Sequence, residues 1–143
     1  MKYGKITIGA AALFMAAWVG YTADGTQGEK KVETRVFEMR TYYAHPGKMN
    51  ALHARFRDHT NKLFVKHGMT LIGYWSPIDS KQAEQKLIYI LAYPSKEAAD
   101  KSWDAFRKDP DWNAARKASE KEGPLVAKVE SVYMNPTDYS PIK

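Results

Sequence analysis

Cysteine is absent from all 143 residues of this chain. The absence excludes disulfide bonds, a lipidated cysteine at a processing site and a cysteine nucleophile. A domain of about 120 residues buries only about two thirds of its unfolded surface. We therefore expect the fold to be held by its apolar core and helped by oligomerisation.

Motifs that specify a reaction or a cofactor are absent too. The sequence contains no GxSxG, no HExxH and no glycine-rich phosphate loop. Its histidines, at positions 45, 53, 59 and 67, include no pair at i, i+4 spacing and join no carboxylate cluster. We therefore expect no metal site and no cofactor.

Charge of one sign is not concentrated anywhere in the chain. The net charge is +6, with lysine and arginine scattered among aspartate and glutamate. Such mixing is typical of a solvated surface, and a nucleic-acid-binding protein would gather its basic residues on one face. The sequence predicts no nucleic-acid partner.

The first 23 residues read as a secretory signal. Lys2 and Lys5 precede an uncharged apolar run from Ile6 to Val19, and small residues follow up to Ala23. The run is shorter than the roughly 20 residues that span a bilayer. We expect a periplasmic or secreted protein without a membrane span in its mature form. Tyr21 is a poor residue beside a cleavage site, so an uncleaved signal anchor is the alternative.

The remaining sequence alternates strand and helix patterns. After a polar linker over 24–31, a domain over 32–135 and a tail over 136–143 are predicted. Within the domain we expect strands over 34–44, 69–76, 86–93 and 125–134, a helix over 48–67, and a helix after Ser95 with a second, short one after Asp109. The polar stretch 78–85 suits a hairpin loop. This β-α-β-β-α-β order predicts an α+β, ferredoxin-like fold with a four-stranded antiparallel sheet.

Both faces of the predicted sheet are apolar. The third strand turns Leu87, Tyr89, Leu91 and Tyr93 one way and Ile88, Ile90 and Ala92 the other. An antiparallel sheet with helices on one face and water on the other would alternate apolar with polar residues. A homodimer that packs sheet on sheet is the simplest explanation. The alternative is a monomer with scattered surface aromatics.

Several residues resemble those of the NIPSNAP family. The matching segments, in order, are Glu38-Met39-Arg40-Thr41-Tyr42, Pro46-Gly47-Lys48, His59, His67-Gly68, Gly73-Tyr74-Trp75, Trp103 to Phe106 and Asp109-Pro110-Asp111-Trp112. The resemblance covers about Val36 to Met134 and implies a dimeric α/β barrel, in which two ferredoxin-like sheets pack face to face. The wider superfamily includes cofactor-independent monooxygenases, haem-degrading proteins and isomerases, with pockets between sheet and helices.

Glu38, Arg40 and Tyr42 are the first candidate ligand-binding residues. They alternate along one strand and so share one face of the sheet. In a cleft, Arg40 could bind an anionic group and Tyr42 could donate a hydrogen bond. A structural cross-strand ladder of charges explains the same residues without a ligand.

His59, Trp75 and Trp103 complete the candidate set. His59 falls in the apolar stripe of the first helix, so it should point toward the sheet, as an acid, a base, an axial haem ligand or an ordinary core histidine. Both tryptophans fall on predicted buried faces and are explained by a core role. A pocket between the sheet and the second helix would also be lined by such rings and would suit a small apolar or aromatic ligand.

Three functions follow from these residues. The first is a dimeric small-molecule-binding or interaction module without an assigned reaction. The second is a cofactor-independent monooxygenase or isomerase that uses His59, Arg40 and Tyr42 around an aromatic substrate. The third is a haem-binding protein with His59 as the axial ligand.

Overall fold

The computed structural model describes residues 34–143, and the predicted signal segment lies outside them. The helices and strands are β1 (Val36–Ala44), α1 (Met49–Arg55), the π-helical turn η1 (Phe56–Thr60), α2 (Asn61–Lys66), β2 (Thr70–Trp75), α3 (Ser80–Ala83), β3 (Lys86–Tyr93), α4 (Lys96–Lys108), α5 (Pro110–Ser119) and β4 (Val126–Met134). The sheet has the strand order β2-β3-β1-β4 with antiparallel neighbours. The predicted α+β, ferredoxin-like fold is confirmed.

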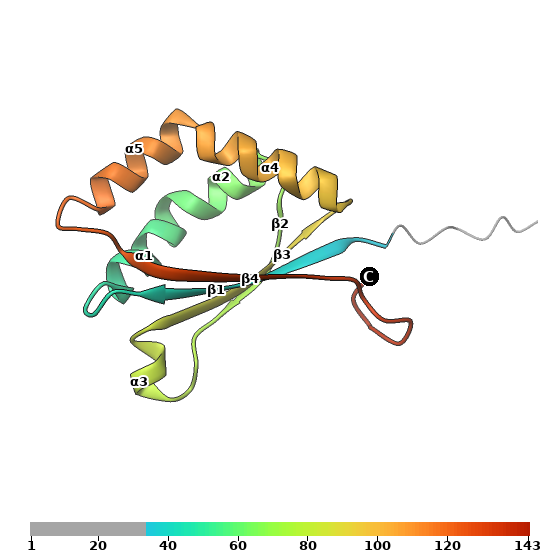
Figure 1. The fold of residues 1–143 in the computed structure, drawn as a ribbon, viewed down its shortest axis with the longest axis horizontal. Coiled ribbons are helices and arrows are strands. Elements are labelled where there is room, and N and C mark those ends of the chain that lie inside the picture. The colour runs from blue at the N-terminus through green and yellow to red at the C-terminus, as the bar shows by residue number, and fades with distance from the viewer. Residues whose placement is uncertain (1–33) are drawn as a thin grey trace, which may run out of the picture. The chain divides into compact units, whose positions relative to one another are not determined.

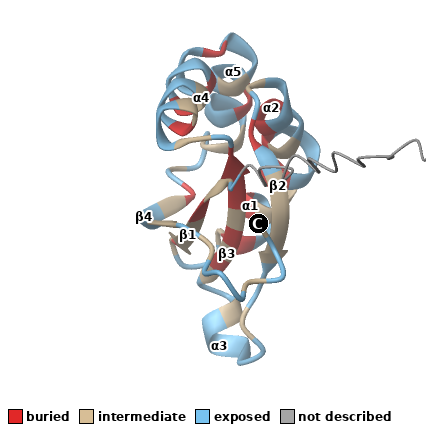
Figure 2. Cartoon of the chain, turned by 90° about the vertical axis from the view of Figure 1, so that its right-hand side faces the viewer, coloured by how far each residue is buried: buried red, intermediate tan, exposed pale blue. Residues whose placement is uncertain are grey.

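Helices α1, α2, α4 and α5 lie on one face of the sheet (Figure 1). The central strand β3 turns Leu87, Tyr89 and Leu91 toward them, and these side chains are 0–2% exposed. Buried residues gather on the strands and on the inner sides of the helices (Figure 2). The predicted division of β3 into two faces is therefore confirmed.

Within residues 34–143, no large helix lies on the opposite face, which is called the open face below. The strand register places Met39, Ile90 and Val132 side by side on it, from β1, β3 and β4. Val132 is 50% exposed. Part of this face borders the C-terminal tail, which forms an apolar groove with Phe37 and Ile90.

Local signals at the helix ends act as the sequence predicts. Ser95 accepts a hydrogen bond from the Ala98 backbone N–H at the start of α4. Asp109 accepts one from the Asp111 N–H, with Pro110 in the first turn of α5. These caps satisfy N–H groups that have no partner inside a helix.

The first long helix departs from the prediction at the π-helical turn η1. A π turn closes an i→i+5 hydrogen bond, here from the Asn61 N–H to the Phe56 carbonyl, and so contains one residue more than an α-helical turn. Each extra residue rotates the following side chains by about 100°. The buried stripe therefore continues through Thr60 and Phe64, and His59 is exposed. The prediction that His59 points toward the sheet was wrong.

A bulge in β2 changes the position of Trp75 in the same way. Leu71 lies opposite Leu91, but Gly73 lies opposite Ile90, so the register shifts at Ile72. The extra residue moves Trp75 to the open-face side, where the side chain is 48% exposed. The prediction that Trp75 faces the core was wrong.

The predicted hairpin loop at 78–85 holds the short helix α3. Asp79 caps it by accepting a hydrogen bond from the Gln82 N–H. The turn lies at the end of the β2–β3 hairpin, away from the helical layer (Figure 1).

Candidate functional site

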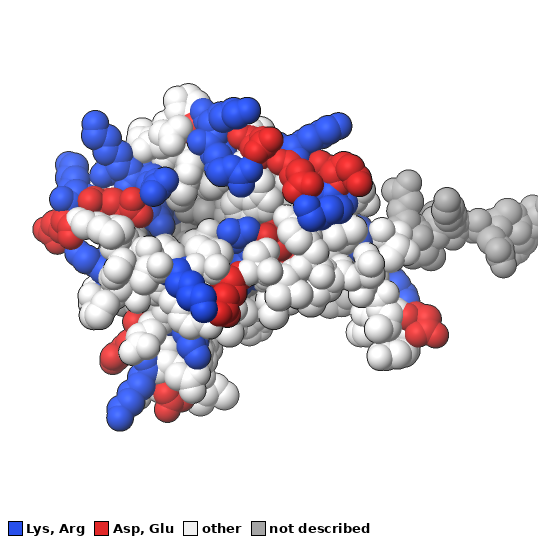
Figure 3. All heavy atoms as spheres, in the orientation of Figure 1, with Lys and Arg blue, Asp and Glu red and all other residues white. Residues whose placement is uncertain are grey.

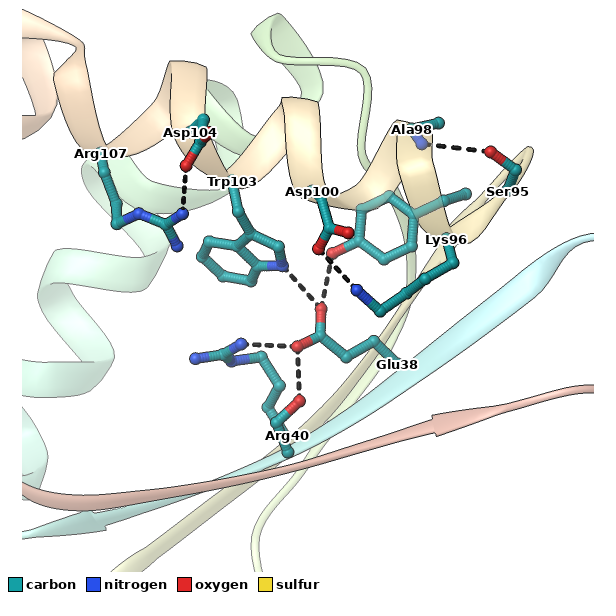
Figure 4. Close-up of polar contacts among 11 residues, drawn as sticks. Glu38, Arg40, Ser95, Lys96, Ala98, Asp100, Trp103, Asp104 and Arg107 are labelled. Carbon is teal, nitrogen blue, oxygen red and sulfur yellow. Dashed lines mark hydrogen bonds and ion pairs between the residues drawn. The ribbon is translucent and has the colours of Figure 1, made fainter.

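Glu38 lies at the centre of a polar cluster between the sheet and α4. Its Oε1 atom accepts hydrogen bonds from Arg40 Nη1 at 2.5 Å and Ser131 Oγ at 2.6 Å. Its Oε2 atom accepts from Trp103 Nε1 at 2.7 Å and Tyr93 Oη at 2.8 Å. Figure 4 shows Trp103 reaching down from α4 to the carboxylate, with Arg40 beside it on the sheet. The cluster ties β1, β3, β4 and α4 together.

The Glu38 carboxylate is fully buried, yet it stays ionised. Burial by itself raises the pKa of Glu38, but the hydrogen bonds from Ser131, Trp103 and Tyr93 and the charge of Arg40 outweigh it and lower the pKa below its ordinary value. A carboxylate offers about four lone-pair directions, and all are used here. Glu38 is therefore an anchor for its neighbours and is not free to accept a proton from a ligand.

Arg40 is the residue that this anchor orients. Its guanidinium carbon lies 4.2 Å from the centre of the Trp103 ring and 5.7 Å from that of Tyr42, in cation–π contact with both. The side chain is still 18% exposed. Its Nε atom is buried and has no hydrogen-bond partner among residues 34–143. Arg40 thus retains donors for a further acceptor.

Tyrosines from two strands stand next to Arg40. Tyr89 lies directly opposite Arg40 in the β1–β3 register, and its ring meets that of Tyr42 at 5.3 Å. Burial raises the pKa of the Tyr89 hydroxyl well above its ordinary value, so the group stays protonated at neutral pH. Like Arg40 Nε, this hydroxyl is buried without a hydrogen-bond partner in the described part of the chain.

We call Arg40, Tyr42, Tyr89 and Trp103 the Arg40 site. Ser131, on the edge strand β4, is exposed, so the site lies close to solvent at that edge. Figure 3, in the orientation of Figure 1, shows a hollow between the helical layer and the sheet. A fixed guanidinium and a protonated phenol are each hydrogen-bond donors to the oxygen of a carbonyl, carboxylate or phenolate, and the surrounding rings suit a flat apolar body.

Four of the six predicted site residues come together in this cluster: Glu38, Arg40, Tyr42 and Trp103. His59 and Trp75 do not join it, because the π turn and the bulge turn them elsewhere. Sequence reasoning missed Tyr89, Tyr93 and Ser131 as partners. Strand alternation placed both tyrosines on the correct face, whereas no pattern marks Ser131.

A second polar cluster connects the end of α2 to the start of α5. Asp109 contacts Lys66 Nζ at 2.8 Å and His67 Nε2 at 2.6 Å. Hydrogen bonds from Lys66 and His67 lower the pKa of Asp109 far below its ordinary value. The side chain of His67, which directly follows α2, therefore joins α2 to the start of α5.

A match to a protein-family model shows which family the chain belongs to. The NIPSNAP family model matches residues 37–141, which include all of the sheet except its first residue and all helices of the described part of the chain. The chain belongs to the NIPSNAP family. No significant match exists among curated protein sequences.

Solved structures share the NIPSNAP fold. A NIPSNAP family protein of unknown function from Agrobacterium tumefaciens strain C58 is 20% identical over 78% of this chain and 96% of its own, with a TM-score of 0.66. An uncharacterised NIPSNAP domain protein from Burkholderia xenovorans is 21% identical over 74% and 98%, with a TM-score of 0.62. A monooxygenase from the gene ActVA-Orf6 of Streptomyces coelicolor, in complex with the ligand nanaomycin D, is 12% identical over 78% and 95%, with a TM-score of 0.51. At these identities the likeness shows the fold.

Within residues 34–143, no helix combines the length and apolar character that a membrane crossing requires.

Proposed function

We propose that this NIPSNAP domain is an exported, dimeric protein that binds a small aromatic molecule carrying an oxygen acceptor, at the Arg40 site. The observation that carries the proposal is a pair of donors without a hydrogen-bond partner, Arg40 Nε and the Tyr89 hydroxyl. The guanidinium group to which Nε belongs is held in place by Glu38. A buried polar atom without a partner costs about 1–3 kcal/mol. A bound acceptor oxygen would remove that cost.

Benzoate is a suitable probe because it joins a carboxylate to a flat ring. We expect it to bind the wild-type protein by isothermal titration calorimetry, and Arg40→Met to weaken binding at least about tenfold through loss of the charged donors. Arg35→Met is the matched control, since Arg35 contacts the Phe37 ring and the Lys143 carbonyl. Equal benzoate affinity in wild type and Arg40→Met would reject the site. Native mass spectrometry of protein from its own host tests for a retained ligand.

The dimer is supported by the open face. Met39, Ile90 and Val132 form a continuous apolar row on it, and the large helices all lie on the other side of the sheet. Exposed apolar patches of this kind mark interaction surfaces, and a second copy of the chain offers a matching apolar row. The occupant we propose is therefore another molecule of the same protein, packed sheet to sheet.

Export is proposed from the sequence of residues 1–23, which lie outside the described residues. Intact-mass measurement of the protein purified from its host tests it, because cleavage removes the mass of the signal segment. A full-length mass in a membrane fraction would instead indicate the uncleaved anchor.

A cofactor-independent oxygenase or isomerase is the second candidate, acting at the same Arg40 site. It is favoured by donors that can stabilise negative charge on a substrate oxygen, as in an enolate or phenolate. The fold-level likeness to the ActVA-Orf6 monooxygenase agrees with this candidate. Oxygen consumption with an aromatic substrate, lost in Arg40→Met, would support it over simple binding. Haem ligation by His59 is not proposed, because that side chain is exposed and does not point toward the sheet.

A further inference from the structure

A separate cavity lies at the β2 edge of the sheet, where strand and first helix meet. Its volume is about 390 Å³, which is within the range of small-molecule pockets. The wall combines apolar and polar side chains: His53, Phe56, Arg57, Asn61, Tyr74, Trp75, Ser76 and Leu87. It is distinct from the Arg40 site, because its lining includes none of that site's four residues, Arg40, Tyr42, Tyr89 and Trp103.

The π-helical turn η1 builds one wall of this cavity. Phe56 and Arg57 belong to the turn, and Asn61 is the residue that closes its i→i+5 hydrogen bond. In an unbroken α-helix the side chain at 61 would be rotated by about 100° away from this wall. The extra residue thus places an amide beside the cavity. π turns inside α-helices occur frequently at functional sites.

Two polar atoms of the lining residues are unsatisfied. Asn61 Oδ1 and the Tyr74 hydroxyl are both shielded from solvent, and neither has a hydrogen-bond partner within residues 34–143. Burial raises the pKa of Tyr74, so its hydroxyl is neutral. The Tyr74 ring stacks on Tyr89 at 5.4 Å and meets Phe56 edge to face at 5.8 Å, which fixes the ring in place.

We infer that this cavity is a second ligand site, for a small neutral aromatic molecule that carries a hydroxyl group. The hydroxyl donates its proton to Asn61 Oδ1 and accepts from Tyr74, because a hydroxyl is both donor and acceptor. The ring lies against Phe56 and Leu87. A carboxylate would not satisfy Asn61 Oδ1, because it has no proton to donate to that oxygen.

The inference is tested with p-cresol and toluene as probes, which differ by one hydroxyl. Dissociation constants are measured on the purified protein by two-dimensional ¹H–¹⁵N NMR titration, with the backbone amides of residues 56, 57 and 61, which line the cavity, as reporters. Asn61→Leu keeps the approximate shape and removes the acceptor, while Tyr74→Phe removes a single oxygen. Tyr139→Phe is the matched control, because Tyr139 is 83% exposed in the tail and lines no part of the cavity.

We expect p-cresol to bind about tenfold more tightly than toluene, the usual effect of hydrogen bonds to buried groups. Asn61→Leu and Tyr74→Phe should each remove most of this preference and leave toluene binding unchanged, and Tyr139→Phe should behave as wild type. Equal affinities for both probes, or an unchanged preference in Tyr74→Phe, would overturn the inference. Tyr74→Phe decides the matter if Asn61→Leu does not fold. Benzoate binding that depends on Arg40 is measured separately, so the two sites succeed or fail independently.

Discussion

Replacing Glu38 with glutamine changes one atom in the buried cluster and removes its charge. The amide offers one acceptor oxygen and one N–H donor group. Tyr93 and Ser131 can adapt, because a hydroxyl rotates to accept a hydrogen bond. Arg40 and the Trp103 indole can only donate. In either amide orientation, the new NH₂ group therefore faces one of these two donors across a contact of 2.5–2.7 Å.

The cost of Glu38→Gln follows from that conflict. One buried donor without a partner costs about 1–3 kcal/mol, and the loss of the charged partner of Arg40 adds to it. Because the Arg40 side chain is 18% exposed, water compensates part of the second loss. We expect a total decrease of about 2–4 kcal/mol in the free energy of unfolding. For a domain of this size the melting temperature should fall by about 8–16 °C.

Urea denaturation followed by circular dichroism measures this change, and its pH dependence provides a second test. The folded-state pKa of Glu38 is below the ordinary value of 4.5, so ionised Glu38 stabilises the protein above that pH. This stabilisation is lost as the pH falls through the folded-state pKa. The stability difference between wild type and Glu38→Gln should therefore be constant above about pH 5 and narrow in more acidic solution.

Glu122→Gln is the matched control, since Glu122 is exposed and only its backbone carbonyl makes a hydrogen bond. It should change stability by less than about 0.5 kcal/mol. If Glu38→Gln is as mild as this control, the carboxylate is not buried among four donors in solution. The assignment of Arg40 as an oriented donor would then fail as well.

Further predictions concern the surface, the second polar cluster and the dimer. Ile90→Asp should produce a monomer by light scattering while circular dichroism stays native, and an unchanged mass would reject the open face as the dimer interface. Asp109→Asn should lower the melting temperature and reduce its salt dependence, because Lys66 and His67 lose their anionic partner; an unchanged melting curve would show that these contacts carry no stability. His59→Ala should change the free energy of unfolding by less than about 0.5 kcal/mol, as for other exposed side chains. A larger loss would contradict the outward position that the π turn gives His59.

Periodic patterns made most of the fold predictable. The alternation in β1 and β3 identified which side chains face the helices, and Ser95 and Asp109 marked two helix starts. The same alternation placed Glu38, Arg40 and Tyr42 on one face.

The errors arose where one residue is inserted into a regular element. The π turn moves His59 outward, and the β2 bulge moves Trp75 to the other face. Neither insertion changes the composition of its segment, so a periodic pattern runs through both without a visible break.

The partners of Glu38 could not be predicted for another reason. Trp103 and Ser131 are 65 and 93 residues away in the chain, and local patterns carry no information on which distant side chains meet.

Those long separations also determine when the Glu38 cluster can form during folding. Closing a loop of that length costs entropy before any contact compensates it, so distant pairings form late. Ser131 lies on the last strand, which pairs directly with the first. A chain still lacking β4 would hold Glu38 near an unfilled sheet edge, where water can reach the carboxylate. The last strand therefore completes the sheet and supplies Ser131 to the cluster that orients Arg40, so the ligand binding proposed for Arg40 requires β4 to be in place.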